Sequence, residues 1–246
     1  MRRNMFSRKK DIRKILPPPL KARHSEYSMI FSLDDDPARP SDYLVSVALE
    51  AVRKAREINL DDLCGRLKAP PYYPNIWPGE HYKLLGGLIL SLKPRAVVEI
   101  GTSTGLSALA MKKYLPSEAK IFTFDIRDCK SDPDYVLREG DFADGRLVQL
   151  LDDLSQPDIF LKYGGILKTA DFIFLDASKD GVTEEKFLEN FQRVPFRDRM
   201  LILLDDIRLW NMLKIWRDIA SPKLDLTSFG HWSGTGVVEW KSLNPR

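Results

Sequence analysis

The chain has 246 residues, of which 43% are apolar, and a formal net charge of +3. This length and apolar content suffice for one substantial hydrophobic core, so we expect one catalytic domain behind an N-terminal extension. The two cysteines have no paired spacing, which excludes a disulfide framework and a zinc ligand set, and no apolar run reaches the roughly 20 residues of a membrane span. Because the N-terminus also lacks the apolar stretch of a signal peptide, we predict a cytoplasmic protein.

The first 23 residues form a basic arm with nine Lys or Arg and one Asp, so its net charge is +8 and that of the remaining chain is −5. Such an arm is able to contact nucleic acid or an anionic membrane surface, but we favour a solvated, flexible extension over residues 1–40. The rest of the chain offers no stacking pattern for single strands and no zinc module. We therefore do not expect nucleic acid as a partner.

Residues 41–79 are expected to form a cap region ahead of the catalytic domain, which we place at residues 80–246. Apolar residues recur at helical spacing between residues 41 and 67, which predicts one or two helices that cover the edge of a sheet. The next segment, 68–78, is rich in proline and aromatic residues. We expect an ordered loop there, followed by a helix over residues 80–92.

A buried parallel strand is predicted at residues 96–100, which are apolar apart from Glu99. A loop of small residues follows, and apolar residues then recur at helical spacing from residue 104 to 114. Gly101 and Gly105 allow the loop to turn tightly and approach a ligand, while the start of the helix offers unpaired N–H groups. This arrangement is suited to hold a nucleoside. The Gly-x-Gly-x-x-Gly and Gly-Lys-Ser/Thr motifs are absent, which argues against a dehydrogenase or a kinase.

The spacing Glu-x-Gly-x-x-x-Gly at residues 99–105 resembles the first motif of class I S-adenosylmethionine (SAM)-dependent methyltransferases. The resemblance implies an α/β fold with a Rossmann-like, seven-stranded, mostly parallel sheet, helices on both faces and a reversed last strand. It also implies that this loop contacts the methionine end of SAM. The cofactor-binding candidates here are Glu99, Gly101, Thr102, Ser103 and Gly105. An ordinary strand-to-helix turn with incidental glycines is the alternative.

A second apolar run, residues 120–125, ends in Asp125, 26 residues after the first acid. In nucleoside-binding open sheets, an acid at the tip of the second strand accepts hydrogen bonds from the ribose hydroxyls, so we assign Asp125 to the ribose. A third element over residues 136–142 ends in Gly-Asp-Phe, and Asp141 and Phe142 are candidates to bind the adenine. Because Asp is also a common turn former at strand ends, each acid has a purely structural alternative.

Two further apolar runs also end in acids, residues 171–176 in Asp176 and residues 200–206 in Asp205 and Asp206. Parallel sheets place ligands at the carboxyl ends of their strands, so the three carboxylates should converge beside the sulfonium of the cofactor, which Asp176 also helps to bind. Three hard oxygen donors suit an octahedral divalent cation such as Mg²⁺. We predict a metal site, with a cluster of helix-capping acids as the alternative.

The same region resembles the catechol and caffeoyl-coenzyme A O-methyltransferases, which carry Asp-x-x-Lys after one strand and Asp-Asn after the next. Here the motifs read Asp-Ala-Ser-Lys at residues 176–179 and Asp-Asp at residues 205–206, and the resemblance spans residues 80–206. It implies a catalytic base, Lys179, that takes the proton of the substrate hydroxyl, and three metal ligands, Asp176, Asp205 and Asp206.

Two features of these motifs leave alternatives open. In the alternative interpretation, Lys179 is not a base but a solvated lysine that pairs with Asp176 or Asp180. Asp206 replaces the usual Asn, and related metal-dependent sugar O-methyltransferases also use paired acids. The acceptor class therefore stays open.

In the resembling enzymes, the chain before the first helix of the domain lies over the active site. Tyr72, Tyr73 and Trp77 accordingly either line the acceptor pocket or pack on the flank of the domain. The roles of Glu80 and His81 are open in the same way.

The last part of the chain completes the expected sheet. A helix is predicted over residues 207–216, with Trp210 or Asn211 facing the metal edge and Trp216 in the core. Two strands, 224–229 and 236–240, should form a hairpin. We expect His231, near the tip of this hairpin, to be solvated and not catalytic.

These features predict a SAM-dependent, divalent-metal-assisted O-methyltransferase acting on a small hydroxylated acceptor, such as a phenol, a catechol or a sugar. The expected cofactors are SAM and Mg²⁺ or another divalent cation, and a homo-oligomer is compatible with the sequence. One alternative is a metal-independent methyltransferase that recruits a protein or nucleic acid through the basic arm. The other is a non-catalytic relic that still binds the cofactor.

Overall fold

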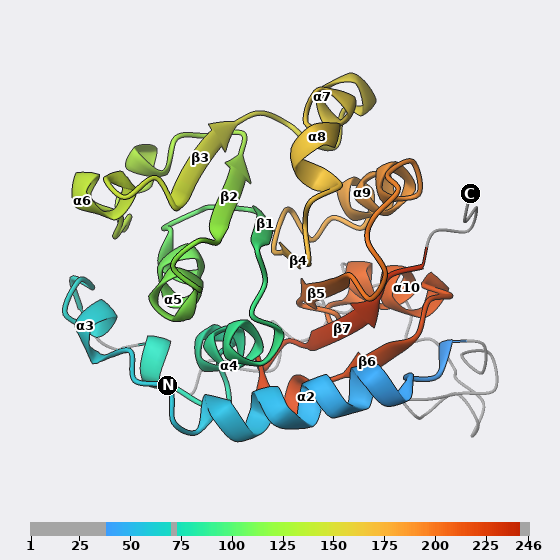
Figure 1. The fold of residues 1–246 in the computed structure, drawn as a ribbon, viewed down its shortest axis with the longest axis horizontal. Coiled ribbons are helices and arrows are strands. Elements are labelled where there is room, and N and C mark those ends of the chain that lie inside the picture. Colours follow the sequence, from blue (N-terminus) through green and yellow to red (C-terminus); the bar gives the residue numbers. More distant parts are fainter. Residues whose placement is uncertain (1–37, 70–72, 242–246) are drawn as a thin grey trace, which may run out of the picture.

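A seven-stranded sheet forms the centre of the protein in a computed structural model that describes residues 38–69 and 73–241 (Figure 1). The strand order is β3-β2-β1-β4-β5-β7-β6. Strands β1 to β5 are parallel, whereas β7 runs antiparallel to both β5 and β6. The strands are β1 (Ala96–Ile100), β2 (Lys120–Asp125), β3 (Leu147–Leu151), β4 (Phe172–Leu175), β5 (Leu201–Asp205), β6 (Lys223–Asp225) and β7 (Thr235–Glu239).

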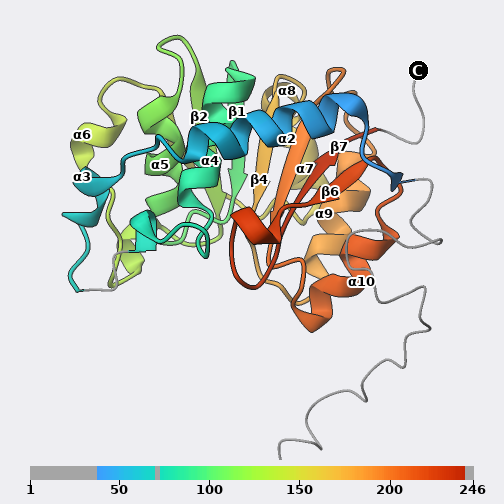
Figure 2. The same cartoon turned by 90° about the horizontal axis from the view of Figure 1, so that it is seen from below.

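Helices cover both faces of the sheet, because successive side chains of a strand point to opposite sides (Figures 1 and 2). In β5, Leu201 and Leu203 belong to one apolar core, while Ile202 and Leu204 belong to the other. The first core is covered by α2 (Asp42–Ala55), α4 (Tyr82–Leu92) and α5 (Leu106–Tyr114). The second is covered by α7 (Pro157–Lys162), α8 (Gly164–Leu167), α9 (Thr183–Phe191) and α10 (Trp210–Asp218).

The helix α2 is an integral part of the first core. Ser41 caps its start by accepting a hydrogen bond from the backbone N–H of Leu44 (3.1 Å), and the apolar side of the helix packs on α4. A Cβ atom at Gly87 of α4 would lie 2.2 Å from the carbonyl oxygen of Ala51, so glycine is what allows the two helices to approach. The short elements are α3 (Asp61–Cys64), α6 (Glu139–Phe142), η3 (Tyr73–Asn75), η4 (Cys129–Ser131) and η5 (Thr227–Phe229).

The predicted fold is confirmed, including the reversed last strand. The prediction of a strand-like element at residues 136–142 is wrong. Residues 139–142 form the short helix α6, and the third strand lies at residues 147–151. Val136 and Leu137 are buried against the loop after β1, where Val136 donates a backbone hydrogen bond to Thr104 (2.9 Å). Their apolar character therefore serves a loop contact and not a strand.

The predictions for the basic arm and for Tyr72 lie outside the described residues. Among the residues that the structure describes, no helix is both long and apolar enough to cross a membrane.

Candidate active site

The carboxyl ends of β2, β1, β4 and β5 lie side by side at one edge of the sheet. Asp125 ends β2, Gly101 follows β1, Asp176 follows β4, and Asp205 ends β5. The backbone N–H of Asp176 donates to the carbonyl oxygen of Ile100 (2.9 Å), which ties the end of β4 to the end of β1. The structure thus brings Asp125, the acid predicted for the ribose, to the same edge as the acids predicted for the ion.

The loop after β1 owes its shape to two glycines. Gly101 has a φ of +105°, and a Cβ atom there would lie 1.9 Å from the carbonyl oxygen of Asp176. Gly105 has a φ of +82°, and its Cβ would meet the side chain of Leu137 at 2.3 Å. The backbone N–H of Ser103 donates to Asp125 (3.0 Å). The loop and the predicted ribose acceptor are therefore in direct contact.

Glu99 and Thr102 lie beneath this loop and not on its outer side. Glu99 is fully buried, and its two carboxylate oxygens accept hydrogen bonds from Ser107 and Thr123, each at 2.5 Å. The hydroxyls of Thr102 and Thr123 lie 2.7 Å apart. Burial raises the pKa of Glu99 to about 7, although the hydroxyl donors lower it. Both side chains therefore support the loop, and whether either residue also contacts the cofactor stays a prediction.

Asp141 and Phe142 do not stand at the end of a strand. Asp141 accepts hydrogen bonds from Arg66 (2.6 and 3.0 Å) and from the backbone N–H of Arg138 (2.7 Å). Burial alone would raise the pKa of Asp141, but the hydrogen bonds from Arg66 and Arg138, together with the charges of Arg66 and Lys112, lower it. Phe142 packs against the first core. The residues that follow the third strand are Asp152 and Asp153, and neither was among the site residues predicted from the sequence.

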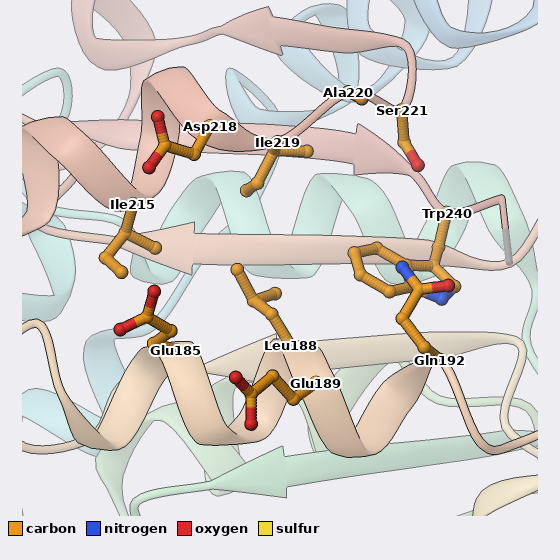
Figure 3. A pocket seen from close by; sticks show the side chains of 10 residues that line it. All are labelled: Glu185, Leu188, Glu189, Gln192, Ile215, Asp218, Ile219, Ala220, Ser221 and Trp240. Carbon is orange, nitrogen blue, oxygen red and sulfur yellow. The ribbon is translucent and has the colours of Figure 1, made fainter. Parts of the chain in front are cut away.

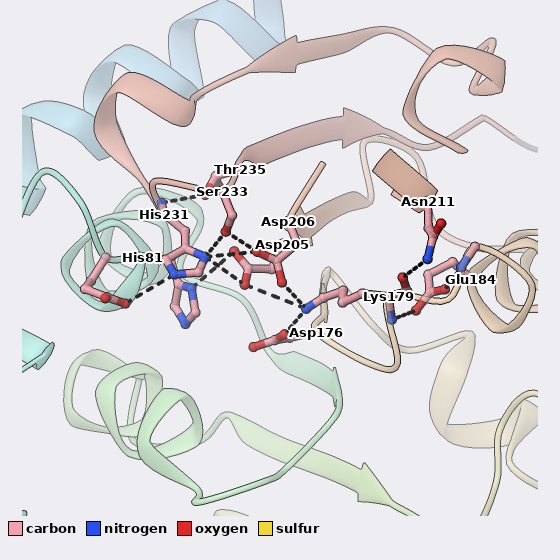
Figure 4. A network of polar contacts seen from close by, with 12 residues as sticks. His81, Asp176, Lys179, Glu184, Asp205, Asp206, Asn211, His231, Ser233 and Thr235 are labelled. Carbon is pink, nitrogen blue, oxygen red and sulfur yellow. Dashed lines mark hydrogen bonds and ion pairs between the residues drawn. The ribbon is translucent and has the colours of Figure 1, made fainter. Parts of the chain in front are cut away.

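The carboxylates of Asp176, Asp205 and Asp206 converge on the ammonium group of Lys179 (Figure 4). One oxygen from each of the three acids lies within 4.8 Å of the others. The Nζ atom of Lys179 contacts Asp176 and lies 2.9 Å from Asp206 and 3.8 Å from Asp205. The predicted metal ligands therefore form a cluster that already surrounds one positive charge.

Lys179 is held in place at both its backbone and its side chain. Its φ of +60° places it in the left-handed region, and its backbone N–H donates to the buried Glu184 (2.8 Å). Burial lowers the pKa of Lys179, but the carboxylates of Asp176, Asp205 and Asp206 outweigh burial and raise the pKa. In this arrangement Lys179 is a cation and not a free base.

Two histidines complete the cluster, and both were underestimated from the sequence. His81, just before α4, is 4% exposed, and its Nδ1 atom lies 3.3 Å from Asp205. The Nδ1 atom of His231 lies 3.1 Å from Asp206 and 3.4 Å from Asp205. Burial lowers the pKa of His231, but the two aspartates outweigh it and raise the pKa to about 10. Burial lowers the pKa of His81, but Asp205 and Asp176 together outweigh burial and raise it.

The expectation that His231 is solvated is wrong, since its side chain is only 17% exposed. The reason lies in the sheet topology. Thr235, the first residue of β7, pairs with Asp205, the last residue of β5, because these strands are antiparallel. The loop before β7 therefore returns to the edge that carries the acids. The reversed last strand was the signal that could have located this histidine.

The remaining predicted residues divide between core, loop and surface. Trp216 is buried, as expected, and the side-chain amide of Asn211 donates to the carbonyl oxygen of Lys179 (3.2 Å). The indole N–H of Trp77 donates to the carbonyl oxygen of Phe229 (2.7 Å), which joins the loop before α4 to the loop before β7. Tyr73 is exposed in η3. Whether Tyr73 and Trp77 contact an acceptor stays a prediction.

A pocket of about 240 Å³ lies between α9 and α10 (Figure 3). Leu188, Ile215 and Trp240 line it, together with acidic residues such as Glu185 and Glu189. None of the acids or histidines of the cluster contributes to it. Trp240 follows the far end of the antiparallel strand β7, so this pocket is separate from the candidate active site.

The sheet order, the reversed strand and the glycine-bearing loop beside the acid of β2 define the class I methyltransferase fold. A family model described as O-methyltransferase matches residues 75–215, which is more than half of the chain. The chain therefore belongs to the O-methyltransferase family and is a SAM-dependent methyltransferase. No significant match is found among curated proteins.

Several solved structures are similar to this chain. The SAH-bound methyltransferase PaMTH1 of Podospora anserina is 16% identical, with a TM-score of 0.51, and the alignment covers 79% of this chain and 88% of that chain. A Corynebacterium glutamicum protein is 17% identical over 79% and 92% of the two chains, with a TM-score of 0.47. MycE methyltransferase of the mycinamycin pathway, in complex with Mg and SAH, is 19% identical over 48% and 30%, with a TM-score of 0.37. Such low identities support the fold alone.

Proposed function

We propose that this chain is a divalent-metal-assisted O-methyltransferase that transfers the methyl group of SAM to a hydroxyl of a small acceptor, such as a phenol, a catechol or a sugar. The observation that carries the proposal is the convergence of Asp176, Asp205 and Asp206 at the edge where the loop after β1 meets Asp125. Acids on neighbouring strand ends would then hold both the methyl donor and the acceptor.

The residues at this edge fit a divalent cation. Three carboxylates provide the hard oxygen donors that Mg²⁺ and similar ions prefer, and their oxygens are close enough to share one ion. The ammonium of Lys179 among them is consistent with a position that needs positive charge. When bound, such an ion would lower the pKa of an acceptor hydroxyl and help to orient it.

The chain's own residues would provide the remaining functions. The loop at residues 101–105 and Asp125 would bind the nucleoside and orient the methyl group. The acceptor oxygen would form a bond to the methyl carbon as the carbon–sulfur bond breaks, leaving S-adenosylhomocysteine (SAH), and the hydroxyl proton would pass to a base. Lys179 remains our candidate for that base. Because the three carboxylates raise its pKa, it would have to lose contacts with them before it accepted a proton.

One observation favours a metal-independent enzyme as the second candidate. The Lys179 ammonium already contacts the carboxylates of all three acids, so it could neutralise them without an ion. Such an enzyme would activate the acceptor through hydrogen bonds alone, and its acceptor could be a protein or a nucleic acid.

A methyl-transfer screen separates these candidates. Full-length protein would be incubated with labelled SAM and with catechol, phenol or glucose, in Mg²⁺ or in chelator. We expect turnover in Mg²⁺ that is lost in chelator and in Asp205→Asn, while SAH binding measured by calorimetry is retained. Asp218→Asn, an exposed acid on α10, is the matched control and should behave like the wild type. Turnover that persists unchanged in chelator would refute the metal proposal.

A further inference from the structure

His231 lies between Glu80, which precedes α4, and the two aspartates at the end of β5. Its Nδ1 atom faces Asp206 and Asp205, at 3.1 and 3.4 Å, and its Nε2 atom lies 3.7 Å from Glu80. The side chains of His231 and Glu80 are 17% and 13% exposed. Figure 4 shows the histidines on one side of Asp205 and Asp206 and Lys179 on the other. The imidazole therefore has a carboxylate at each of its two nitrogens.

The contacts of Asp206 are divided between its two oxygens. The Oδ1 atom accepts a hydrogen bond from Ser233 and faces His231, whereas the Oδ2 atom faces the Lys179 ammonium at 2.9 Å. A carboxylate fixed through one oxygen has its other oxygen directed to the opposite side. His231 and Ser233 thus direct one oxygen of Asp206 toward the centre of the acid cluster.

The backbone at Asp206 and at the facing Gly234 adopts uncommon conformations. Asp206 has a φ of +61°, a conformation that is unfavourable for a residue with a Cβ atom. Its N–H donates to the carbonyl oxygen of Gly234 (2.7 Å), and Gly234 has a φ of +121°. A Cβ atom at Gly234 would lie 2.5 Å from the backbone nitrogen of Arg208. The loop before β7 is therefore fitted closely against the loop that carries Asp206.

We propose that His231, whose Nε2 atom faces Glu80, is a positioning residue that orients the carboxylates of Asp205 and Asp206 to receive a divalent cation. This inference rests on the proposed function, because it concerns the same acids. Groups that hydrogen-bond to metal ligands fix the orientation of those ligands, and their loss typically weakens metal binding by about 10- to 100-fold. The histidine acts through the aspartates and does not itself touch the acceptor or SAM.

The test uses Mn²⁺ as the probe ion and the full-length protein, with binding measured by electron paramagnetic resonance and calorimetry. We expect His231→Ala to weaken Mn²⁺ binding by about 10- to 100-fold, while His231→Asn, which keeps a nitrogen near the Nδ1 position, recovers most of the affinity. SAH affinity should stay at the wild-type value in both variants. Asp218→Asn, at an exposed acid on α10 outside the acid cluster, should bind Mn²⁺ like the wild type.

A second variant covers the case in which His231→Ala does not fold. Glu80→Gln keeps the imidazole and changes only the group at its Nε2 atom, and it should also weaken Mn²⁺ binding. Wild-type affinity for Mn²⁺ in folded His231→Ala and in Glu80→Gln would overturn this inference and leave the metal proposal intact. If wild-type protein does not bind Mn²⁺ in a manner that depends on Asp205, the proposed function itself fails and the inference falls with it.

Discussion

Replacing Glu99 with glutamine should remove a pH dependence from the stability of the fold. The Glu99 carboxyl is fully buried beneath the loop after β1 and is contacted by the hydroxyls of Ser107 and Thr123. Glutamine has nearly the same shape and still offers an oxygen and a nitrogen to these hydroxyls. The variant therefore removes the titration while it disturbs the packing little.

The sign of the effect follows from the two pKa values of Glu99. Its ordinary value is 4.5, and burial raises the pKa to about 7 in the fold. The unfolded chain consequently loses the proton first, and the free energy of unfolding falls as the pH rises between these values. The difference between the two pKa values of Glu99 changes the free energy of unfolding by about 3 kcal/mol, because each pKa unit corresponds to about 1.4 kcal/mol. The stabilisation that the protonated Glu99 carboxyl contributes is complete below pH 4.5 and is lost above about pH 7.

Urea unfolding of the wild type and of Glu99→Gln between pH 5 and pH 8 measures this contribution. We expect the stability difference between the two proteins to shift by roughly 2–3 kcal/mol in favour of the variant as the pH rises. Glu118→Gln, at an exposed position after α5, is the control and should run parallel to the wild type. Parallel curves for Glu99→Gln as well would refute the raised pKa of this buried carboxyl.

Three further changes test residues that were predicted to bind the cofactor. Asp125→Ala should weaken SAH binding by about tenfold with little change in Tm, since its carboxylate is the predicted ribose acceptor; unchanged calorimetric affinity would refute that role. Gly101→Ala should destabilise the fold by about 2 kcal/mol or more, because its Cβ would lie 1.9 Å from the carbonyl oxygen of Asp176. Gly164→Ala, which meets no atom within 4 Å, should be nearly neutral, and equal unfolding free energies for the two variants would contradict this explanation. Asp141→Asn should cost about 1–3 kcal/mol of stability, because it weakens the pairing with Arg66; weaker SAH binding would support the predicted adenine role, and unchanged SAH affinity would refute it.

The positions of the acids were predictable because short apolar runs that end in a carboxylate mark parallel strands. In a parallel sheet the order of neighbouring strands then brings their ends together. Asp125, Asp176 and Asp205 occupy such ends, and the sequence contained everything needed to place them. The glycines of the first loop were predictable for a similar reason, since Gly101 and Gly105 both adopt positive φ.

The errors arose where tertiary contacts decide the outcome. The apolar residues Val136 and Leu137 suggested a strand, but Leu137 fills the space beside Gly105, and the backbone N–H of Val136 donates to Thr104. His81 and His231 are 150 positions apart and meet only because the antiparallel β7 returns its preceding loop to the acid-bearing edge. A local sequence pattern does not predict a contact between residues so far apart in the chain. The side-chain partners of Glu99 were equally hidden, because they come from α5 and β2.

A crystal structure with SAH and Mn²⁺, with anomalous scattering recorded for manganese, tests the central claim most directly. Our account predicts SAH against the loop at residues 101–105 and Asp125, and one anomalous peak among the carboxylates of Asp176, Asp205 and Asp206. SAH bound at that loop with no manganese peak at the three acids, and with the Lys179 ammonium still among them, would contradict it.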